Sequence, residues 1–419
     1  MTTLDEDAPI TRAAPATRSR KLPPVVWVGV VFSGLILISL VRLVTGADNL
    51  DSVGAVQSAI LAAVPIAMAG LSGLWSERAG VVNIGLEGMM ILGTFGAGWA
   101  GYQWGPWAGV AFGIICGVLG GLLLGLAAIT FGVDHIIAGV AISIIAPGLT
   151  LFLSQLLFAN APGGGDQQSP PVSDVYKITI PGLSDWLNTL QGKGWFLISD
   201  IAGILGGTLT QLSLLTVIAA LLIIFSGFVL WRTRFGLRLR SVGEAPYAAE
   251  SLGVNVVRYK YIGVIVSGAM SGFAGAFLVV GQNYINGQTA GRGYIGLAAL
   301  IFGNWRPGGM ASGAVLFGYT QGVGLFDSDG TAMRAFLLLV TAALVLVAIL
   351  QIRRGQRMVG VVALLIGVLC LVWFMLTTSL PGQLVTAAPY AITLLVMGLA
   401  SQRLRPPKAD GLPYRKGSH

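Results

Sequence analysis

Residues 105–131 read GPWAGVAFGIICGVLGGLLLGLAAITF and contain no charged side chain. This run is longer than the ~20 residues with which an α-helix crosses about 30 Å of hydrocarbon. Glycine occupies every fourth position over most of it, which places a glycine stripe on one face of the expected helix. Such a stripe lets helix backbones pack closely in lipid, either within one chain or between subunits. These glycines are Gly105, Gly109, Gly113, Gly117, Gly121 and Gly125.

The same apolar character recurs along the whole chain. Of its 419 residues, 55% are hydrophobic and only 10% are charged, whereas soluble domains carry about 25% charged residues. We therefore predict an all-α polytopic membrane protein with about 10–12 transmembrane helices. The run 293–303 is too short to span upright and predicts a re-entrant half-helix or a tilted broken helix. The apolar runs are 25–44, 54–74, 81–102, 107–131, 136–158, 213–231, 259–281, 293–303, 308–326, 332–351, 359–378 and 386–401.

The distribution of Lys and Arg predicts the orientation of these spans. With alternating spans and the N-terminus inside, 20 basic residues lie inside and 5 outside, whereas acidic residues divide about evenly. Excess Lys and Arg in the cytoplasmic loops is the usual signature of membrane topology. The N-terminus and C-terminus are thus both expected to be cytoplasmic.

Composition outside the spans predicts the remaining organisation. Residues 1–24 are polar and rich in Thr, Ala and Pro, which is typical of a disordered tail. A transmembrane domain follows over 25–401, and 402–419 form a second cytoplasmic tail. The loop 159–212 is long and lies outside in this topology. Its amphipathic piece 183–190 is suited to the membrane interface.

Several classes of activity are excluded by missing residue types. Two Cys and two His residues do not suffice for a disulfide framework or a Cys/His metal cluster. The chain also lacks G-x-x-x-x-G-K-[ST], the loop that cradles nucleotide phosphates. We predict no catalytic residues, no metal and no resident cofactor.

The net charge of +8 follows from the cytoplasmic Lys and Arg and does not indicate nucleic-acid binding. The pair Asp134–His135 is expected to be a helix cap and not a proton relay.

The strongest polar signal within the spans lies in SERAGVVNIGLEGMMILG, residues 76–93. Glu87 is the one acidic residue well inside an apolar run, and a carboxylate there costs about 2.5–3.5 kcal/mol. Asn83 precedes it by four residues, which predicts that both lie on the same helical face. The neighbouring glycines favour close helix contact or a broken helix. Asn83 and Glu87 are therefore candidates either for a substrate path or for a brace between helices.

The inner loop 232–258 is the second long loop and the only densely charged part of the chain body. Its four arginines, Arg232, Arg234, Arg238 and Arg240, need only anionic lipid headgroups as partners. A short helix is expected over 244–252, bounded by Gly243 and Gly253. Such a helix, with Ala248 and Ala249 presented between glycines, is suited to insertion into a groove of a partner protein.

Three motifs in this order resemble the permease subunits of bacterial ABC importers of the branched-chain-amino-acid and simple-sugar superfamily, with a type II importer fold. They are SERAGVVNIGLEGMMILG, GEAPYAAESLGVNV, and GRGYIGLAALIFGNWRPGGMASGAVLFG at 291–318. The resemblance covers about 50–350 and is greatest to nucleoside-type permeases that work with basic-membrane-protein lipoproteins. The spans in 359–401 are additions to that core. In such permeases the inner loop is the coupling helix. The resemblance thus implies contact with the ATPase at Gly243, Glu244, Ala248, Ala249, Glu250 and Gly253.

The resemblance also implies partners and a function. It implies a separate ABC ATP-binding subunit that carries ATP and magnesium, a paralogous second permease, an external substrate-binding lipoprotein, and a place in the bacterial plasma membrane. The expected function is ATP-driven import of nucleosides, with this chain forming the path. A permease for ribose-like sugars is the alternative within the class. An ion-coupled secondary transporter is disfavoured because such proteins usually need several intramembrane charges.

Overall fold

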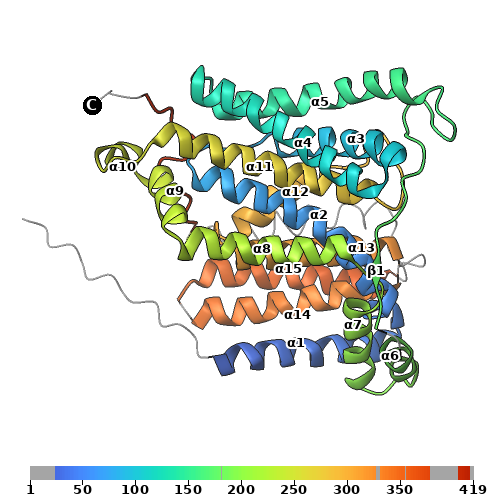
Figure 1. Cartoon of the computed structure of the whole chain (residues 1–419). Helices are drawn as coiled ribbons and strands as arrows, with labels where there is room; N and C mark the ends of the chain where they lie inside the picture. The colour runs from blue at the N-terminus through green and yellow to red at the C-terminus, as the bar shows by residue number, and fades with distance from the viewer. Residues whose placement is uncertain (1–23, 181, 327–330, 354, 378–403, 416–419) are drawn as a thin grey trace, which may run out of the picture.

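The computed structural model describes residues 24–180, 182–326, 331–353, 355–377 and 404–415 (Figure 1). The tail expected over 1–24, apart from Pro24, and the apolar run 386–401 lie outside the described residues. Ten helices in these ranges have 19 residues or more, and seven are long and apolar enough to cross a membrane. The all-α polytopic fold is therefore confirmed.

The helix bounds follow the apolar runs closely. The long helices are α1 (Pro24–Thr45), α2 (Val53–Arg78), α3 (Leu86–Trp104), α4 (Pro106–Gly125), α5 (His135–Phe158), α8 (Leu214–Arg232), α11 (Val256–Val279), α13 (Pro307–Phe326), α14 (Thr331–Arg353) and α15 (Arg357–Leu376). The shorter elements are η1 (Asp48–Leu50), η2 (Leu126–Thr130), α6 (Leu183–Gly192), α7 (Ile198–Leu209), α9 (Arg234–Glu244), α10 (Pro246–Ser251) and α12 (Arg292–Phe302), with strands β1 (Lys177–Ile178) and β2 (Leu212–Ser213).

The helices form a bundle with an inner and an outer layer. In α2 and α11, 67% of the apolar stretch is buried inside the protein, against 17% in α15. The short run 293–303 forms the 11-residue helix α12, called the half-helix here, which packs against α2 and α13, and α13 also packs along α2. Figure 1 shows α1, α5, α8 and α14 along the outside of this core. Their exposed faces carry large apolar side chains such as Leu43, Ile144 and Ile224, which is expected where lipid is the solvent.

Polar caps mark where several helices begin. Asp134 accepts hydrogen bonds from the backbone N–H groups of Ile136 (2.9 Å) and Ile137 (3.1 Å) and so caps α5. The prediction that this residue is a helix cap is confirmed. Ser52 caps α2 and Asn255 caps α11 in the same way. These side chains satisfy backbone donors that have no partner within their own helix.

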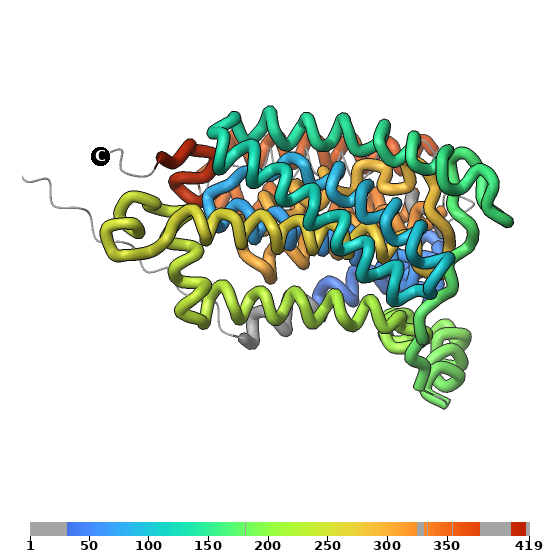
Figure 2. The backbone as a smooth tube through the Cα atoms, turned by 45° about the horizontal axis from the view of Figure 1, so that its top comes forward, coloured from blue at the N-terminus to red at the C-terminus, as the bar shows by residue number. Residues whose placement is uncertain are grey.

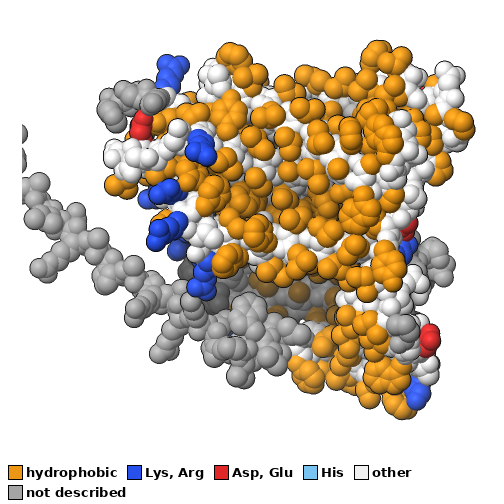
Figure 3. All heavy atoms as spheres, viewed as in Figure 1, with side chains coloured by type: hydrophobic (Ala, Val, Ile, Leu, Met, Phe, Trp, Pro, Cys, Tyr) orange, Lys and Arg blue, Asp and Glu red, His pale blue; other side chains and the backbone are white. Residues whose placement is uncertain are grey.

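The bundle has two chemically different ends. The basic end, defined by Arg232, Arg234, Arg238 and Arg240, holds α9 and α10, and Figure 3 shows Lys and Arg side chains gathered there. The opposite end, called the loop end here, holds α6, α7 and the two-stranded pairing of β1 with β2. The flank between the two ends is almost wholly apolar in the same view.

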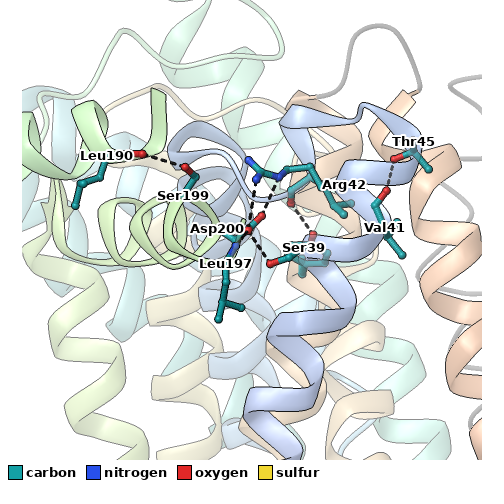
Figure 4. Close-up of polar contacts among 10 residues, drawn as sticks. Ser39, Val41, Arg42, Thr45, Leu190, Leu197, Ser199 and Asp200 are labelled. Carbon is teal, nitrogen blue, oxygen red and sulfur yellow. Dashed lines mark hydrogen bonds and ion pairs between the residues drawn. The ribbon is translucent and has the colours of Figure 1, made fainter. Parts of the chain in front are cut away.

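The long segment 159–213 is folded and fixed to the bundle at the loop end. Arg42 of α1 forms an ion pair with Asp200 of α7, Nε to Oδ1, at 2.9 Å (Figure 4). Asp200 also accepts hydrogen bonds from the Ser39 hydroxyl (2.6 Å) and from the backbone N–H of Leu197 (2.9 Å). The side chain of Asp200 is fully buried. This ion pair is therefore one anchor of the segment, and the Gln57 side chain of α2, which donates to Thr210 at 3.2 Å, is a second.

Replacing Asp200 by Ala is expected to loosen the attachment of α6 and α7. Removing one partner of a buried ion pair leaves an uncompensated charge and costs about 3–5 kcal/mol. Limited proteolysis of the purified protein should then cut the segment around Trp195 much faster. The double variant Arg42→Met with Asp200→Leu is expected to recover most of the resistance. Equal cleavage of Asp200→Ala and the parent would show that other contacts hold the segment.

Candidate functional site

The connection between α2 and α3 leaves the helical path. Helix α2 ends at Arg78, Gly80 has a φ of +79°, and α3 begins only at Leu86. Asn83 therefore lies in an extended stretch and not on the helix that carries Glu87. The expected common helical face is wrong, because the chain stays non-helical from the left-handed Gly80 to the start of α3 at Leu86, beyond Asn83.

Asn83 is buried against α11. Its amide nitrogen donates a hydrogen bond to the Ser267 hydroxyl at 2.8 Å, and Ser267 in turn contacts the Ser72 hydroxyl at 2.8 Å. Ser271 donates to Ser72 at 2.8 Å. Asn83 thus takes part in a buried polar network that joins α2, α11 and the 79–85 connection, as hydroxyl and amide side chains commonly do between membrane helices.

Glu87 holds the N-terminus of the half-helix α12. Its two carboxylate oxygens accept hydrogen bonds from the backbone N–H groups of Gly291 (2.9 Å) and Gly293 (2.7 Å). The side chain comes from α3, 204 residues earlier in the chain. A negative charge at this position satisfies unpaired donors and the positive end of the helix dipole. These two hydrogen bonds join α3 to the start of α12, as a brace between helices would, and a place for Glu87 on the substrate path stays a prediction.

The other end of α12 is held by the last turn of α2. The guanidinium of Arg78 donates two hydrogen bonds to the carbonyl oxygen of Trp305, at 2.6 and 3.2 Å. The Trp305 indole N–H donates to the Glu77 carboxylate. Residues 77–87 therefore clamp both ends of α12 from one short stretch of sequence. This clamp joins the half-helix rigidly to the core.

A cavity of about 410 Å³ opens beside the start of α12 at the loop end. This volume falls in the range typical of sites for small molecules. Gln288 and Arg292 contribute polar groups to its wall, and the Gln288 amide nitrogen is buried without a hydrogen-bond partner. Neither Asn83 nor Glu87 lines it. Its lining residues are Ser58, Leu61, Ala62, Asp174, Lys177, Ser213, Leu215, Phe277, Leu278, Val280, Gly281, Gln282, Ile285, Gln288 and Arg292.

The clamp determines the wall of this cavity. Glu87 binds the backbone on both sides of Arg292, and the Arg292 guanidinium donates to the carbonyl oxygen of Gln288 at 3.0 Å. A buried amide nitrogen without a partner is a donor available to a bound molecule. The sequence analysis missed Gln288 and Arg292, because a single glutamine and arginine in a loop carry no distinctive spacing.

The basic end contains the second candidate site, the elbow formed by α9 and α10. The short helix spans only Pro246–Ser251, and Glu244 is the last residue of α9. Gly243 is buried, and a Cβ there would come within 3.0 Å of the Arg78 carbonyl carbon. Glu244 reaches the Arg78 guanidinium at 3.6 Å. The elbow is thus linked directly to the clamp.

The elbow exposes a different face from the one expected. Ala249 is only 3% exposed and packs against Val242 and Val256, so the expected presentation of Ala249 is wrong. The turn of α10 directs this position back onto α9 and α11. Ala248 and Gly253 are exposed and Glu250 is half-buried. Leu252, which is 85% exposed, is the apolar residue that the sequence analysis missed.

No group of three or more His, Cys, Asp and Glu residues that could hold a metal ion occurs among the described residues. The two cysteines, Cys116 and Cys370, are free. A helical bundle that spans a membrane, with a small-molecule cavity at one end and a charged elbow at the other, defines a transmembrane transport protein.

The chain belongs to the family of permease components of the branched-chain amino acid transport system, whose model matches residues 55–349. It is 32% identical to the guanosine ABC transporter permease protein NupQ of Bacillus subtilis over 86% of this chain and 96% of that protein. It is 31% identical to the nucleoside ABC transporter permease protein NupC of Lactococcus lactis over the same shares.

A more distant relative is a second permease of B. subtilis, the guanosine ABC transporter permease protein NupP. Identity is 23% over 61% of this chain and 69% of that protein. No solved structure matches the chain. The family and the apolar helices make this a multi-pass protein of the cell membrane.

Proposed function

We propose that this chain is the permease subunit of an ATP-driven importer and forms the membrane path for nucleosides. The observation that carries the proposal is its 31–32% identity to guanosine and nucleoside permeases over 86% of its length. The cavity beside Arg292 supports it, because its amide and guanidinium groups are suited to the hydroxyl and base edges of a nucleoside. Ion-coupled transport usually needs several charged groups within the membrane. Glu87 does not support such a mechanism, because its carboxylate is hydrogen-bonded to the backbone of Gly291 and Gly293.

The proposal places the basic end in the cytoplasm, following the excess of Lys and Arg at that end. A separate ATP-binding subunit would dock on α10, and Ala248, Glu250 and Gly253 remain the candidate contacts there. The pair NupP and NupQ in B. subtilis supports a paralogous second permease as partner. At the loop end, the segment 159–213 would face an external substrate-binding lipoprotein.

Coupling follows from the contacts between the elbow and the clamp. Closure of the ATPase would move α10 and α9, and Glu244 would pass this motion to Arg78. Arg78 holds one end of α12, and the other end forms the wall of the cavity. A domain motion shifts affinity only when the two states contact the ligand differently, and displacement of Arg292 supplies such a difference.

The experiment that tests this function is uptake of labelled guanosine by cells that lack the chain and by cells that regain it. We expect uptake only in the second, with competition by unlabelled nucleosides and loss on ATP depletion. Competition by ribose instead would indicate the sugar permease. Uptake that survives ATP depletion and collapses with an uncoupler would indicate ion coupling.

Gln288→Ala is expected to raise the KM for nucleoside uptake about two- to tenfold with little change in the maximal rate. One hydrogen bond to a polar ligand group contributes about 0.5–1.5 kcal/mol, and 1.4 kcal/mol corresponds to a factor of ten. Initial rates over a range of nucleoside concentrations give both constants. Gln103→Ala, a substitution outside the cavity lining, is the matched control. An unchanged KM would remove the cavity from the substrate path.

A further inference from the structure

The C-terminal segment, residues 404–415, lies across the elbow at the basic end. Figure 2 shows this red segment beside the yellow turn that contains α10. The backbone N–H of Ala409 donates a hydrogen bond to the carbonyl oxygen of Gly243 at 2.9 Å. The backbone N–H of Lys408 donates to the Glu244 carboxylate at 3.4 Å. Ala409 is only 5% exposed, so the segment is packed onto the protein.

The segment also contacts the two ends of the clamp region. The Lys260 ammonium of α11 donates to the carbonyl oxygens of Gly80 (3.1 Å) and Leu412 (3.5 Å). The backbone N–H of Arg405 donates to the side chain of Asn304, next to Trp305, at 2.8 Å. The segment thus bridges the elbow, the α2–α3 connection and the turn after α12.

Asp410 inserts between these elements and shares a hydrogen bond with Glu77. Burial, together with the nearby Glu77 charge, raises the pKa of Asp410 to about 9. Protonation of Asp410 therefore favours attachment of the segment, and this contribution is lost as the pH rises. The nearby Lys260 ammonium acts in the opposite direction, because it favours the charged carboxylate.

One face of the segment completes the elbow, and the other is left open. The ring of Tyr414 contacts the ring of Tyr247, with centroids 5.4 Å apart, and packs beside Val242, Ala249 and Val256. This contact helps to explain why Ala249 is not available to a partner. Leu252 in α10's C-cap is 85% exposed, and Leu412 in the segment is 57% exposed.

Leu252 is the C-cap of α10 and Leu412 belongs to the C-terminal segment, so both lie in elements of the basic end. The proposed function places that end in the cytoplasm, where exposed apolar side chains are suited to a protein partner. Helix α10 has only six residues. A stable protein interface needs about 20–30 residues on each side. The short helix alone is therefore too small to hold a separate subunit, and the packed segment 404–415 adds surface next to it.

We propose that residues 404–415 and α10 form one composite docking surface for the ATP-binding subunit, with Leu252 and Leu412 as its apolar anchors. This inference rests on the proposed function and adds a second element to the contact. The segment is then a permanent part of the surface that binds the ATP-binding subunit. It also holds the elbow in contact with residues 77–87.

The first test measures how much ATP-binding subunit copurifies with tagged permease in mild detergent. Leu412→Asp, a change at an exposed side chain, is expected to lower the amount at least tenfold while the paralogous permease is retained. A chain that ends at residue 403 should lose as much, whereas a chain that ends at residue 415 should bind normally. Met358→Asp is the matched control, because Met358 is 83% exposed at the start of α15.

A parallel variant, Leu252→Asp, separates the inference from the function on which it rests. Loss of the ATPase with Leu252→Asp but full retention with Leu412→Asp would overturn the composite surface and leave docking on α10 intact. Full retention with both would overturn docking at the elbow itself. Loss of the paralogous permease as well would assign the segment to folding of the chain and would also overturn the composite surface.

The second test asks whether the segment stays attached during transport. Tyr247→Cys and Tyr414→Cys are combined in a background with Cys116→Ala and Cys370→Ala, and a short reversible thiol cross-linker joins the two positions. Uptake within twofold of the reduced sample is expected from a permanent dock. Uptake that is abolished by the cross-link and restored by reduction would show a detachable inhibitory strap, and the proposal would be wrong.

Discussion

Glu87→Gln is expected to destabilise the protein and to lower uptake about tenfold or more. The two carboxylate oxygens accept from Gly291 and Gly293, and glutamine offers only one acceptor in the same space. Its amide group would face an N–H donor, and the charge that complements the dipole of α12 is lost. Together these effects amount to about 2–4 kcal/mol. Each 1.4 kcal/mol shifts the equilibrium between the held and the released N-terminus of α12 by a factor of ten, and uptake falls with the held fraction.

The measurement combines the thermal unfolding midpoint of the purified permease with nucleoside uptake at matched abundance. Asp185→Asn, at an exposed carboxylate of α6, should change neither. A lower midpoint together with reduced uptake identifies Glu87 as the brace of α12. An unchanged midpoint with lost uptake would instead place the carboxylate on the substrate path. If the unfolding midpoint and the uptake are both unchanged, the two hydrogen bonds of Glu87 make no net contribution to the stability of the protein.

Span positions were predictable from sequence because each depends on a local property. A run of apolar residues must bury its backbone polar groups in helix, whatever surrounds it. The runs at 136–158 and 213–231 accordingly match α5 and α8 within a residue or so. The break before α3 was less predictable. The run at 81–102 looks continuous, but its first five residues follow the left-handed Gly80 and are not helical, so α3 begins only at Leu86.

The contacts of the candidate sites were not predictable from local pattern. Glu87 stood out in the sequence because a carboxylate within the membrane costs free energy. Its hydrogen-bond partners, however, lie 204 and 206 residues away in the chain. Arg78 and Trp305 gave no signal, because an arginine at a helix end and a tryptophan in a loop are common. The C-terminal residues 404–415 are polar and rich in proline, and their packing depends on surfaces that exist only in the folded bundle.

The second large effect is expected from a substitution in the glycine stripe of α4. The sequence left open whether it packs within the chain or between subunits, and the structure shows packing within the chain. Gly109 faces α3, Gly113 lies between α3 and α11, and Gly117 and Gly121 face α11. A Cβ on Gly117 would overlap the carbonyl oxygen of Gly268 and lie 2.6 Å from the Cα of Gly272. The two backbones are therefore in direct contact.

Gly117→Leu is expected to prevent α4 and α11 from packing and to abolish accumulation of folded protein in the membrane. Side chains that overfill a packed core usually cost about 1–3 kcal/mol because neighbouring side chains shift. Here the neighbours are backbone atoms on a facing helix, so the helices must separate and expose the Asn83–Ser267 network as well. Losses above about 4–5 kcal/mol arise from such defects.

Detergent-resistant abundance and the unfolding midpoint measure this effect. Gly148→Leu is the matched control, because Gly148 lies in α5 and an added Cβ there meets nothing within 4 Å. Gly117→Ala should fall between the parent and Gly117→Leu, since one methyl group already overlaps the Gly268 carbonyl. Normal abundance of Gly117→Leu, with an unchanged midpoint, would mean that α4 and α11 are not in backbone contact. The core that positions α12 would then be held by α2 and α3 alone.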